Sequence, residues 1–324
     1  MVTPIVMTVL IVISLGIFAS LVVPRFRLLL ALRPEGRFDQ IGSRILNTLK
    51  FAFGQARMPR DPVAGFAHIF IFSGFLVVSI ATITHFAHAY APDWHFPGLG
   101  DRAGEIYLLI KDTFEILVLL GVTYGLWRRL KPSPSRVGRS WEGVFVLFMI
   151  CSLMLTDFLT YGGELVQSGQ SGLPWNPAGH IASLVLAPLG LETAHLVGVI
   201  SWWIHCIGIL VFLNFLPLGK HFHVITAIPN VFFLNLRPWG QVAKVDLETA
   251  EKFGIGTSAE LTWKMALDTY SCTECGRCAM FCPTVLTNKP LEHRKLNLDL
   301  KHILYEDMPT ILSGDAKKRE ELQP

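Results

Sequence analysis

Five long apolar stretches constrain the fold of this chain more than any other feature. Each is long enough to provide the roughly 20 residues that an α-helix needs to cross the hydrocarbon core of a bilayer. Hydrophobic residues form 51% of the chain and charged residues only 16%, a balance typical of membrane proteins rather than soluble ones. We therefore predict an all-α membrane protein with a five-span transmembrane helix bundle. The spans are expected at 4–23, 65–90, 105–127, 142–161 and 193–217.

The distribution of basic residues predicts how the bundle is oriented. The predicted second loop has only Arg102, and the fourth, 157–192, has no Lys or Arg. Since cytoplasmic loops carry the excess of Lys and Arg, the N-terminus is expected outside and the C-terminal region in the cytoplasm of a cell whose inner membrane holds the bundle. The net charge of +3 is explained by these loops and indicates no nucleic acid. The basic loops contain Arg25, Arg27, Arg33, Arg37, Arg44, Lys50, Arg57 and Arg60, then Arg128, Arg129, Lys131, Arg136 and Arg139.

Four cysteines follow the last span in the pattern C-x2-C-x2-C-x3-C, with Pro283 directly after them. This spacing is typical of a ferredoxin-type 4Fe-4S site. A structural zinc site usually has two separated cysteine pairs, and a disulfide would need an oxidising compartment. The predicted cluster ligands are Cys272, Cys275, Cys278 and Cys282.

The cysteine count predicts an incomplete module. In two-cluster ferredoxins the fourth cysteine of the run ligates the other cluster. The remaining Cys151 and Cys206 lie in apolar stretches and are interpreted as packing residues. We expect one 4Fe-4S cluster, or two if a further motif is supplied elsewhere. The predicted division is a membrane domain 1–224, a linker 225–257 and a partial ferredoxin-like domain 258–324, whose first helix, 258–270, has Ser258 as its N-cap.

Histidines on the second and fifth predicted spans form two pairs at two depths. His68 pairs with His223 on the cytoplasmic side, and His85 pairs with His205 further out. Along each span the two histidines are 17 residues apart (His68 to His85) and 18 residues apart (His205 to His223), which corresponds to about 25 Å and 27 Å of helix. His68 and His85 are about 100° out of phase on one helix, which weakens the outer pair. Two such pairs predict two bis-histidine b-type haems, and a packing role for each histidine is the alternative.

Two neighbouring histidines are alternative ligands. His88 can replace His85, and His221 can replace His223. His205 and His223 are 18 residues apart, five turns of an α-helix, so they share a face if Pro217 leaves the helix intact.

The segments 203–205 and 220–224 resemble the last span of the nitrate reductase gamma subunit, a diheme cytochrome b. That family has five spans, an outside N-terminus and two ligating histidines 18 residues apart on the last span. His68, in Gly65-Phe66-Ala67-His68, fits the family's first ligand on the second span. The next ligand there comes ten residues later, where this chain has Val78.

The whole arrangement resembles the membrane-bound iron–sulfur oxidoreductases related to heterodisulfide reductase. These proteins fuse a gamma-subunit-like cytochrome b to a ferredoxin module and usually to CCG domains, and this chain stops before the second cluster motif. The resemblance implies electron transfer between the quinone pool and a cytoplasmic redox partner, through two haems b and a 4Fe-4S cluster. The implied partner is an electron-transfer flavoprotein, a disulfide-reducing subunit or a CCG-domain subunit.

Charged residues at the start of the third predicted span are candidates for a quinone site. Lys111 and Asp112, with Glu115, can hydrogen-bond a quinol and exchange its protons. The alternative is a Lys111 side chain that extends to the membrane interface. Asp157 and Glu164 on the fourth span are weaker candidates.

Two other functional classes fit parts of the same pattern. A non-catalytic cytochrome b and iron–sulfur anchor would only connect a separate catalytic subunit to the membrane. A transporter or sensor with a regulatory cluster would need no haem. Between these classes, we expect a quinone-linked oxidoreductase component similar to heterodisulfide reductase.

Overall fold

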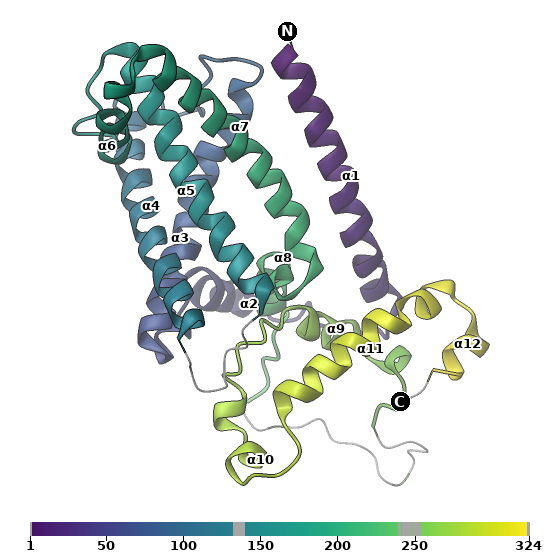
Figure 1. Cartoon of the computed structure of the whole chain (residues 1–324). Helices are drawn as coiled ribbons and strands as arrows, with labels where there is room; N and C mark the ends of the chain where they lie inside the picture. Colours follow the sequence, from purple (N-terminus) through teal and green to yellow (C-terminus); the bar gives the residue numbers. More distant parts are fainter. Residues whose placement is uncertain (1, 132–139, 239–240, 242–247, 249–253, 323–324) are drawn as a thin grey trace. The chain divides into compact units, whose positions relative to one another are not determined.

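The computed structural model describes residues 2–131, 140–238, 241, 248 and 254–322. Within these ranges the protein is helical, and its one β-type pairing is an isolated bridge between Arg33 and Thr262 (Figure 1). The predicted all-α class is therefore confirmed. The long helices are α1 (Val2–Ala31), α3 (Pro62–His88), α4 (Asp101–Leu130), α5 (Trp141–Ser168), α7 (Leu191–Phe215) and α11 (His293–Ser313). The short helices are α2 (Ile41–Thr48), α6 (Pro177–Leu186), α8 (His223–Phe232), α9 (Trp263–Tyr270), α10 (Pro283–Leu286) and α12 (Ala316–Glu320).

Four helices in the described part of the chain are long and apolar enough to cross a membrane, which fits a membrane protein. They cover Thr3–Ala31, Pro62–His88, Trp141–Ser168 and Leu191–Leu218. The third predicted span, 105–127, lies within α4, which is equally long but carries Lys111, Asp112 and Glu115 in its middle. These charges keep α4 out of the apolar group, so this third span, and with it the count of five, stays a prediction.

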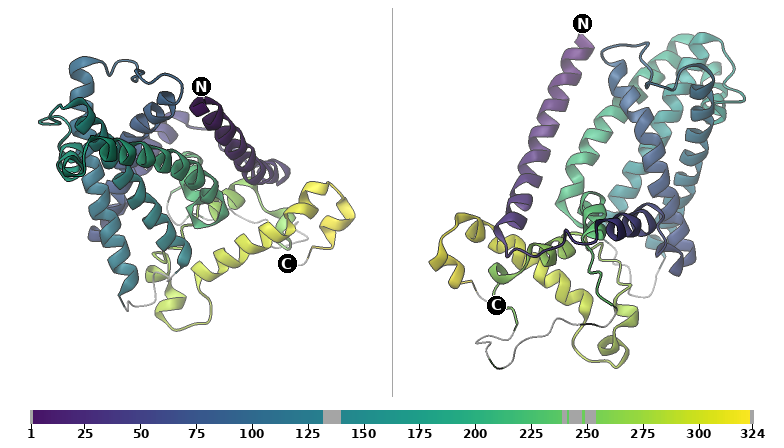
Figure 2. Two further views of the ribbon diagram at one scale, coloured as in Figure 1. Left: turned by 45° about the horizontal axis from the view of Figure 1, so that its top comes forward. Right: turned by 180° about the vertical axis from the view of Figure 1, so that it is seen from behind.

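The chain divides into two compact units. The first contains α3 to α7 and the beginning of α1, and the second contains the rest of α1 with α2 and α8 to α12. Figures 1 and 2 show α3, α4 and α5 of the first unit side by side. The predicted domain boundaries stay a prediction, and much of the linker 225–257, like Arg136 and Arg139, lies outside the described residues.

Glycines allow the helices of the first unit to approach closely. Gly163 of α5 meets Gly198 and Ala194 of α7, while Gly162 meets Ala182 of α6. Small residues at helix interfaces are common in membrane proteins because lipid provides little hydrophobic drive for association, so close backbone packing must replace it. An apolar core joins α3, α4 and α5, and Cys151 and Cys206 pack in apolar clusters, as expected.

Substituting Gly163 with alanine is expected to destabilise the first unit by about 1–3 kcal/mol. A Cβ there would lie 2.9 Å from the Ala194 carbonyl oxygen and from the Gly198 Cα, so the two helices would have to separate. Gly16→Ala is the matched control, because nothing lies within 4 Å of a Cβ at that position. Thermal unfolding of the purified proteins in detergent, followed by circular dichroism, should give a lower midpoint for G163A alone. Equal midpoints would contradict the close-packing argument.

The second unit has a core drawn from both ends of the chain. Leu28 and Leu32 pack with Phe222, Tyr270 and Leu304. The extended segment after α1 pairs with the residues before α9: Arg33 N donates to Leu261 O at 3.1 Å, and Trp263 N donates to Arg33 O at 3.2 Å.

This pairing corrects the predicted helix 258–270. Ser258 begins only a short 3-10 turn, Ser258–Glu260, and its hydroxyl donates to Asp307. Leu261 and Thr262 are extended, and α9 begins at Trp263 with Thr262 as its N-cap. The predicted cap at Ser258 was wrong because tertiary pairing with Arg33 holds the intervening residues out of the helix.

Candidate functional site

A cluster of charged side chains lies inside the helix bundle of the first unit. Its members come from α3, α4 and α5, and none is more than 2% exposed. Lys111, Asp112 and Glu115 lie within about one turn of α4, which brings all three to the same region. Opposite them are Asp157 from α5 and His85 from α3.

Asp157 links the two halves of this cluster. Its Oδ1 is 2.7 Å from His85 Nε2, and its Oδ2 accepts a hydrogen bond from Lys111 Nζ. The same ammonium lies 3.2 Å from Glu115 Oε2 and 3.3 Å from Asp112 Oδ1. One cation thus faces three carboxylates. Because buried charges are tolerated only when paired, Lys111 is the residue that makes this arrangement possible.

Two further contacts hold the cluster in place. Asp112 Oδ2 accepts from Ala178 N at 2.8 Å, at the first turn of α6, where the helix dipole favours a negative charge. The ring of Tyr161 lies 4.2 Å from Lys111 Nζ. The alternative of an interfacial Lys111 is therefore wrong, since its side chain is fully buried.

His205 of α7 has the hydrogen bonding of a metal-ligating imidazole. The residue is 1% exposed, and its Nδ1 lies 3.1 Å from Leu153 O and 3.3 Å from Thr156 Oγ1. A donor bond to the Leu153 carbonyl places the proton on Nδ1 and leaves a lone pair on Nε2. That Nε2 is buried without a hydrogen-bond partner. Leaving a buried acceptor unsatisfied costs folding free energy, so this nitrogen is suited to act as a ligand to a metal such as haem iron.

His85 and His205, which were predicted to pair at the same depth, do lie close together, but His85 has no free ring nitrogen Nε2 for a ligand between them. Their ring centroids are 4.9 Å apart. With Asp157 they form the one group of three or more potential ligands in the described part of the chain whose ligand atoms all lie within 4.8 Å of one another. His85 Nε2 is held by Asp157, and the Nε2 of the alternative ligand His88 lies 2.8 Å from Trp94 O. Only His205 presents a free Nε2 here, so the second outer ligand stays a prediction.

His223, the predicted haem ligand on the cytoplasmic side, lies beyond a break in the last membrane-length helix. α7 ends at Phe215, two 3-10 turns follow, and α8 begins at His223. Because Pro217 and Gly219 interrupt the helix, the expectation that His205 and His223 share one continuous helical face is wrong. His223 Nδ1 lies 2.9 Å from Lys220 O, and burial lowers the pKa of His223, so its neutral form is favoured.

The remaining histidine candidates have ordinary positions. His68 is half-buried in the second turn of α3, in the first unit, whereas His223 belongs to the second, so their pairing stays a prediction. The ring of His221 lies 6.3 Å from that of His223. Glu164 is exposed and does not belong to the buried cluster.

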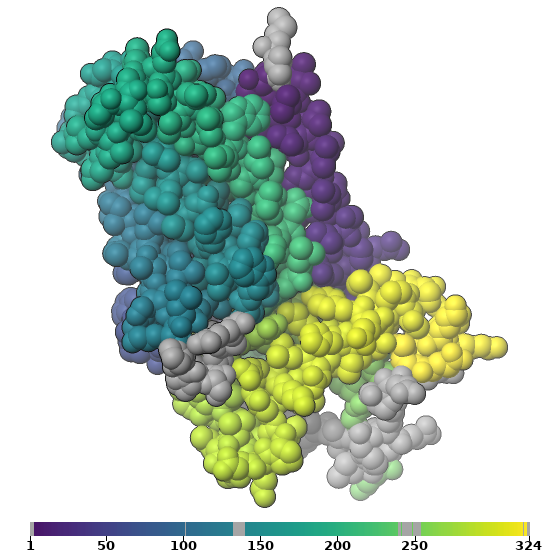
Figure 3. Space-filling view, viewed as in Figure 1, coloured from purple at the N-terminus to yellow at the C-terminus, as the bar shows by residue number. Residues whose placement is uncertain are grey.

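The cysteine run forms an irregular loop at the surface of the second unit (Figure 3, yellow-green). Glu274 and Gly276 have φ angles of +58° and +68°, so the chain reverses direction between the ligands. Pro283 begins α10, where its missing N–H carries no penalty. All four cysteines are free thiols.

Local hydrogen bonds favour the thiolate form in two of the four. Cys282 Sγ lies 2.9 Å from Thr284 Oγ1, and this contact with nearby backbone N–H groups lowers the pKa of Cys282 to about 7. Burial raises the pKa of Cys275, but hydrogen bonds from Arg277 bring it below its usual value. Burial raises the pKa of Cys278. Since a thiolate is the ligand form, this environment suits metal binding.

The core of the second unit connects the inner histidine to the cysteine run. Phe222, next to His223, packs on Tyr270 with ring centroids 5.6 Å apart, and Cys272 follows two residues later. The cysteine run also contacts α11, because Lys301 Nζ lies 3.7 Å from Oε1 of Glu274 within the run.

Sequence reasoning gave Asp157 too small a role. A single carboxylate within an apolar helix is itself a signal of a functional group, and that signal pointed to Asp157. Its contact with both His85 and Lys111 depends on how three helices pack, which no spacing within one helix reveals. Tyr161 was missed because a tyrosine in such a helix is unremarkable.

Two known proteins are similar to the chain. It is 31% identical over 284 residues to the probable iron-sulfur-binding oxidoreductase FadF of Bacillus subtilis (strain 168), which covers 86% of this chain and 39% of that protein. It is 28% identical over 301 residues to the EtfAB:quinone oxidoreductase of Syntrophomonas wolfei subsp. wolfei (strain DSM 2245B / Goettingen), covering 88% and 41% respectively. The chain therefore spans about two fifths of the length of these relatives.

No protein-family model matches the chain, and no solved structure does. The two similarities agree with the cysteine spacing and with the apolar helices. Together they support an iron–sulfur oxidoreductase family for this chain.

Proposed function

We propose that this chain carries electrons between quinone in the membrane and a redox partner in the cytoplasm, as the membrane component of an iron–sulfur oxidoreductase. The observation that carries the proposal is the buried, unbonded Nε2 of His205, which lies beside a cluster of acid–base groups inside the bundle. A relative named for both EtfAB and quinone supports these two reactants, with electron-transfer flavoprotein as the soluble partner. A CCG-domain subunit is the other partner class.

Four cysteines and four histidines have the proposed cofactor roles. Cys272, Cys275, Cys278 and Cys282 hold a 4Fe-4S cluster, and a second cluster would need ligands from elsewhere. His205 would hold the outer haem b, with His85 as its partner once His85 Nε2 is released from Asp157, and His223 with His68 would hold the inner one. When bound, these groups supply the one-electron carriers that a pathway across the bundle needs. The packing of Phe222 on Tyr270 supports a short path from His223 to the cysteine run.

The buried cluster has the proposed role of handling the quinol protons. Quinol oxidation releases protons with its electrons, and Lys111 and Asp112 stay our candidates for the quinone site. One ammonium cannot neutralise three carboxylates, so a proton taken up by one of them relieves their repulsion. Lys111 holds the carboxylates together, and Asp157 connects them to His85. The burial of all these groups excludes water from the path.

The same cluster supports α4 as the third of five spans in an N-out, C-in bundle. Charged residues inside a membrane face the bundle interior and pair with each other. Lys111, Asp112 and Glu115 do both. The C-terminal cysteine module would then lie in the cytoplasm of a cell with this bundle in its inner membrane.

A reduced-minus-oxidised optical spectrum of the purified chain, with iron and labile-sulfide analysis, tests the proposal. We expect a b-type band corresponding to two haems. His205→Ala should lose one of them, because its Nε2 is the free ligand. His195→Ala should keep both, since His195 is exposed on the same helix. A wild-type spectrum without a b-type band would overturn the haem assignment.

The same preparation separates an oxidoreductase from a passive anchor. Adding a soluble quinol without any partner protein should reduce the haem within the isolated chain. Failure of quinol to reduce a haem that dithionite does reduce would favour the anchor.

A further inference from the structure

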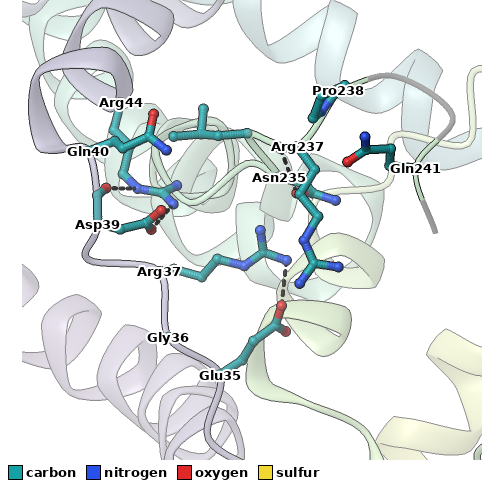
Figure 4. A pocket seen from close by; sticks show the side chains of 11 residues that line it. Glu35, Gly36, Arg37, Asp39, Gln40, Arg44, Asn235, Arg237, Pro238 and Gln241 are labelled. Carbon is teal, nitrogen blue, oxygen red and sulfur yellow. Dashed lines mark hydrogen bonds and ion pairs between the residues drawn. The ribbon is translucent and has the colours of Figure 1, made fainter. Parts of the chain in front are cut away.

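The second unit contains a pocket of about 830 Å³ with three arginines in its lining. Figure 4 shows its two walls, which are the segment from Glu35 to Gln40 before α2 and the segment from Asn235 to Pro238 after α8. Neither wall contributes to the candidate cluster or haem sites. The three arginines are Arg37, Arg44 and Arg237.

Arg44 fixes the two walls relative to each other. Its side chain is 1% exposed, and it donates to Phe232 O at 3.1 Å and Leu234 O at 2.9 Å on one side. On the other side it bonds Asp39, through both the carboxylate and the backbone carbonyl. The opening is therefore a built feature of the fold, and Arg44 itself is already occupied by protein acceptors.

Arg37 and Arg237 extend from opposite walls into this opening (Figure 4). Arg37 pairs with Glu35. Burial raises the pKa of Glu35, but a hydrogen bond from Thr262 and the Arg37 guanidinium hold it below its usual range, so Glu35 stays charged and orients Arg37. Three guanidinium groups face two carboxylates, Glu35 and Asp39, which leaves the lining with an excess positive charge.

An exposed apolar surface begins at the same place. Arg44 and Thr48 are buried on the side of α2 that packs on α8. On its other side, α2 and the following turn η1 (Leu49–Phe53) expose large apolar residues, with Leu46 reaching 67%. A helix with this pattern lies in the membrane interface with its apolar side toward the acyl chains. The exposed residues are Ile41, Ile45, Leu46, Leu49 and Phe53.

The pocket also lies directly after a membrane-length helix. α1 ends at Ala31, and α2 begins at Ile41. Glu35 comes four residues after the end of α1, so it cannot lie more than about 14 Å from that end. A helix that crosses the bilayer ends at the headgroup region, so a spanning α1 would place the start of this wall near the lipid headgroups.

We propose that this pocket binds the phosphate of an anionic phospholipid, with Arg37 and Arg237 as its ligands and the acyl chains along the exposed face of α2 and η1. The planar guanidinium fork matches phosphate oxygens two at a time, which an ammonium cannot do. A lipid rather than a free phosphate is the occupant because the apolar face continues from the pocket. The site is independent of the proposed electron path.

Native mass spectrometry of the full chain in detergent tests the site. Phosphatidylglycerol should bind, and phosphatidylcholine with the same acyl chains should bind much more weakly. The variant R37A/R237A should bind phosphatidylglycerol roughly 10- to 30-fold more weakly, with unchanged iron and haem content. The matched control R27A/R60A removes two exposed arginines outside the pocket and should bind as the wild type does.

The contrary outcomes are equally specific. An equal loss in R27A/R60A would mean general attraction to basic loops and would overturn the site. Displacement of the lipid by millimolar inorganic phosphate would identify a free phosphate as the ligand instead. R37K/R237K keeps the charge and the fold but removes the fork, so wild-type binding by that variant would also contradict the proposal.

Discussion

Replacing Lys111 with methionine is expected to destabilise the protein by about 3–5 kcal/mol, the cost of leaving buried charges without their partner. Lys111 is the one cation among Asp112, Glu115 and Asp157, and all four side chains are fully buried. Without it, three carboxylates would have to repel one another inside the bundle or take up protons. Thermal unfolding of the detergent-solubilised variant should show a large drop in the midpoint.

Three further variants identify the cause. Lys131→Met removes an ammonium from an exposed position at the end of the same helix and should leave stability almost unchanged. K111R keeps a cation in the cluster and should lose less stability than K111M. K111M/D157N removes one uncompensated charge and should recover part of the loss. If K111M unfolds at the same temperature as K131M, the cluster does not depend on Lys111.

Replacing Cys275 with serine is expected to remove the iron–sulfur cluster. Cys275 is the central ligand of the first three, and its thiol is already biased toward the thiolate by Arg277. The wild type should contain about four non-haem iron and four labile sulfide per cluster, and C275S should fall to background in both. Cys151→Ser is the matched control, since Cys151 packs in the apolar bundle and should keep the full content. A C275S protein with wild-type iron would contradict the assignment.

Cys282→Ser answers a different question about the same run. If the four cysteines share one cluster, C282S should lose iron as C275S does. If Cys282 belongs to a second cluster, the iron held by Cys272, Cys275 and Cys278 should persist. Electron paramagnetic resonance of the reduced variants distinguishes the two arrangements.

The positions of the long helices could be predicted because apolar length is a local property. Four of the five predicted spans coincide with apolar helices, and the remaining one, 105–127, lies in α4. The cysteine ligands could be singled out for a similar reason, since their spacing is short and the chemistry demands it. The features that could not be predicted are those that depend on contacts between segments far apart in the sequence.

Three particulars show this limit. The Thr262 cap of α9 depends on Arg33, more than 200 residues earlier. The central position of Asp157 depends on how α3 and α4 pack against α5. The shared face of His205 and His223 depended on Pro217 leaving the helix intact. Sequence alone could not decide whether this proline bends the helix or ends it, and α7 in fact ends at Phe215.

The pairing of Arg33 with Leu261 and Trp263 has a consequence for biosynthesis. Of the eight buried residues of the second unit's core in the described part of the chain, two are made before residue 57 and the other six after residue 214. At about 5–20 residues per second, a ribosome needs on the order of 10–30 s to translate what lies between. During that time Leu28 and Leu32 have no permanent neighbours, so a chaperone or the insertion machinery must shield them until the C-terminal half emerges.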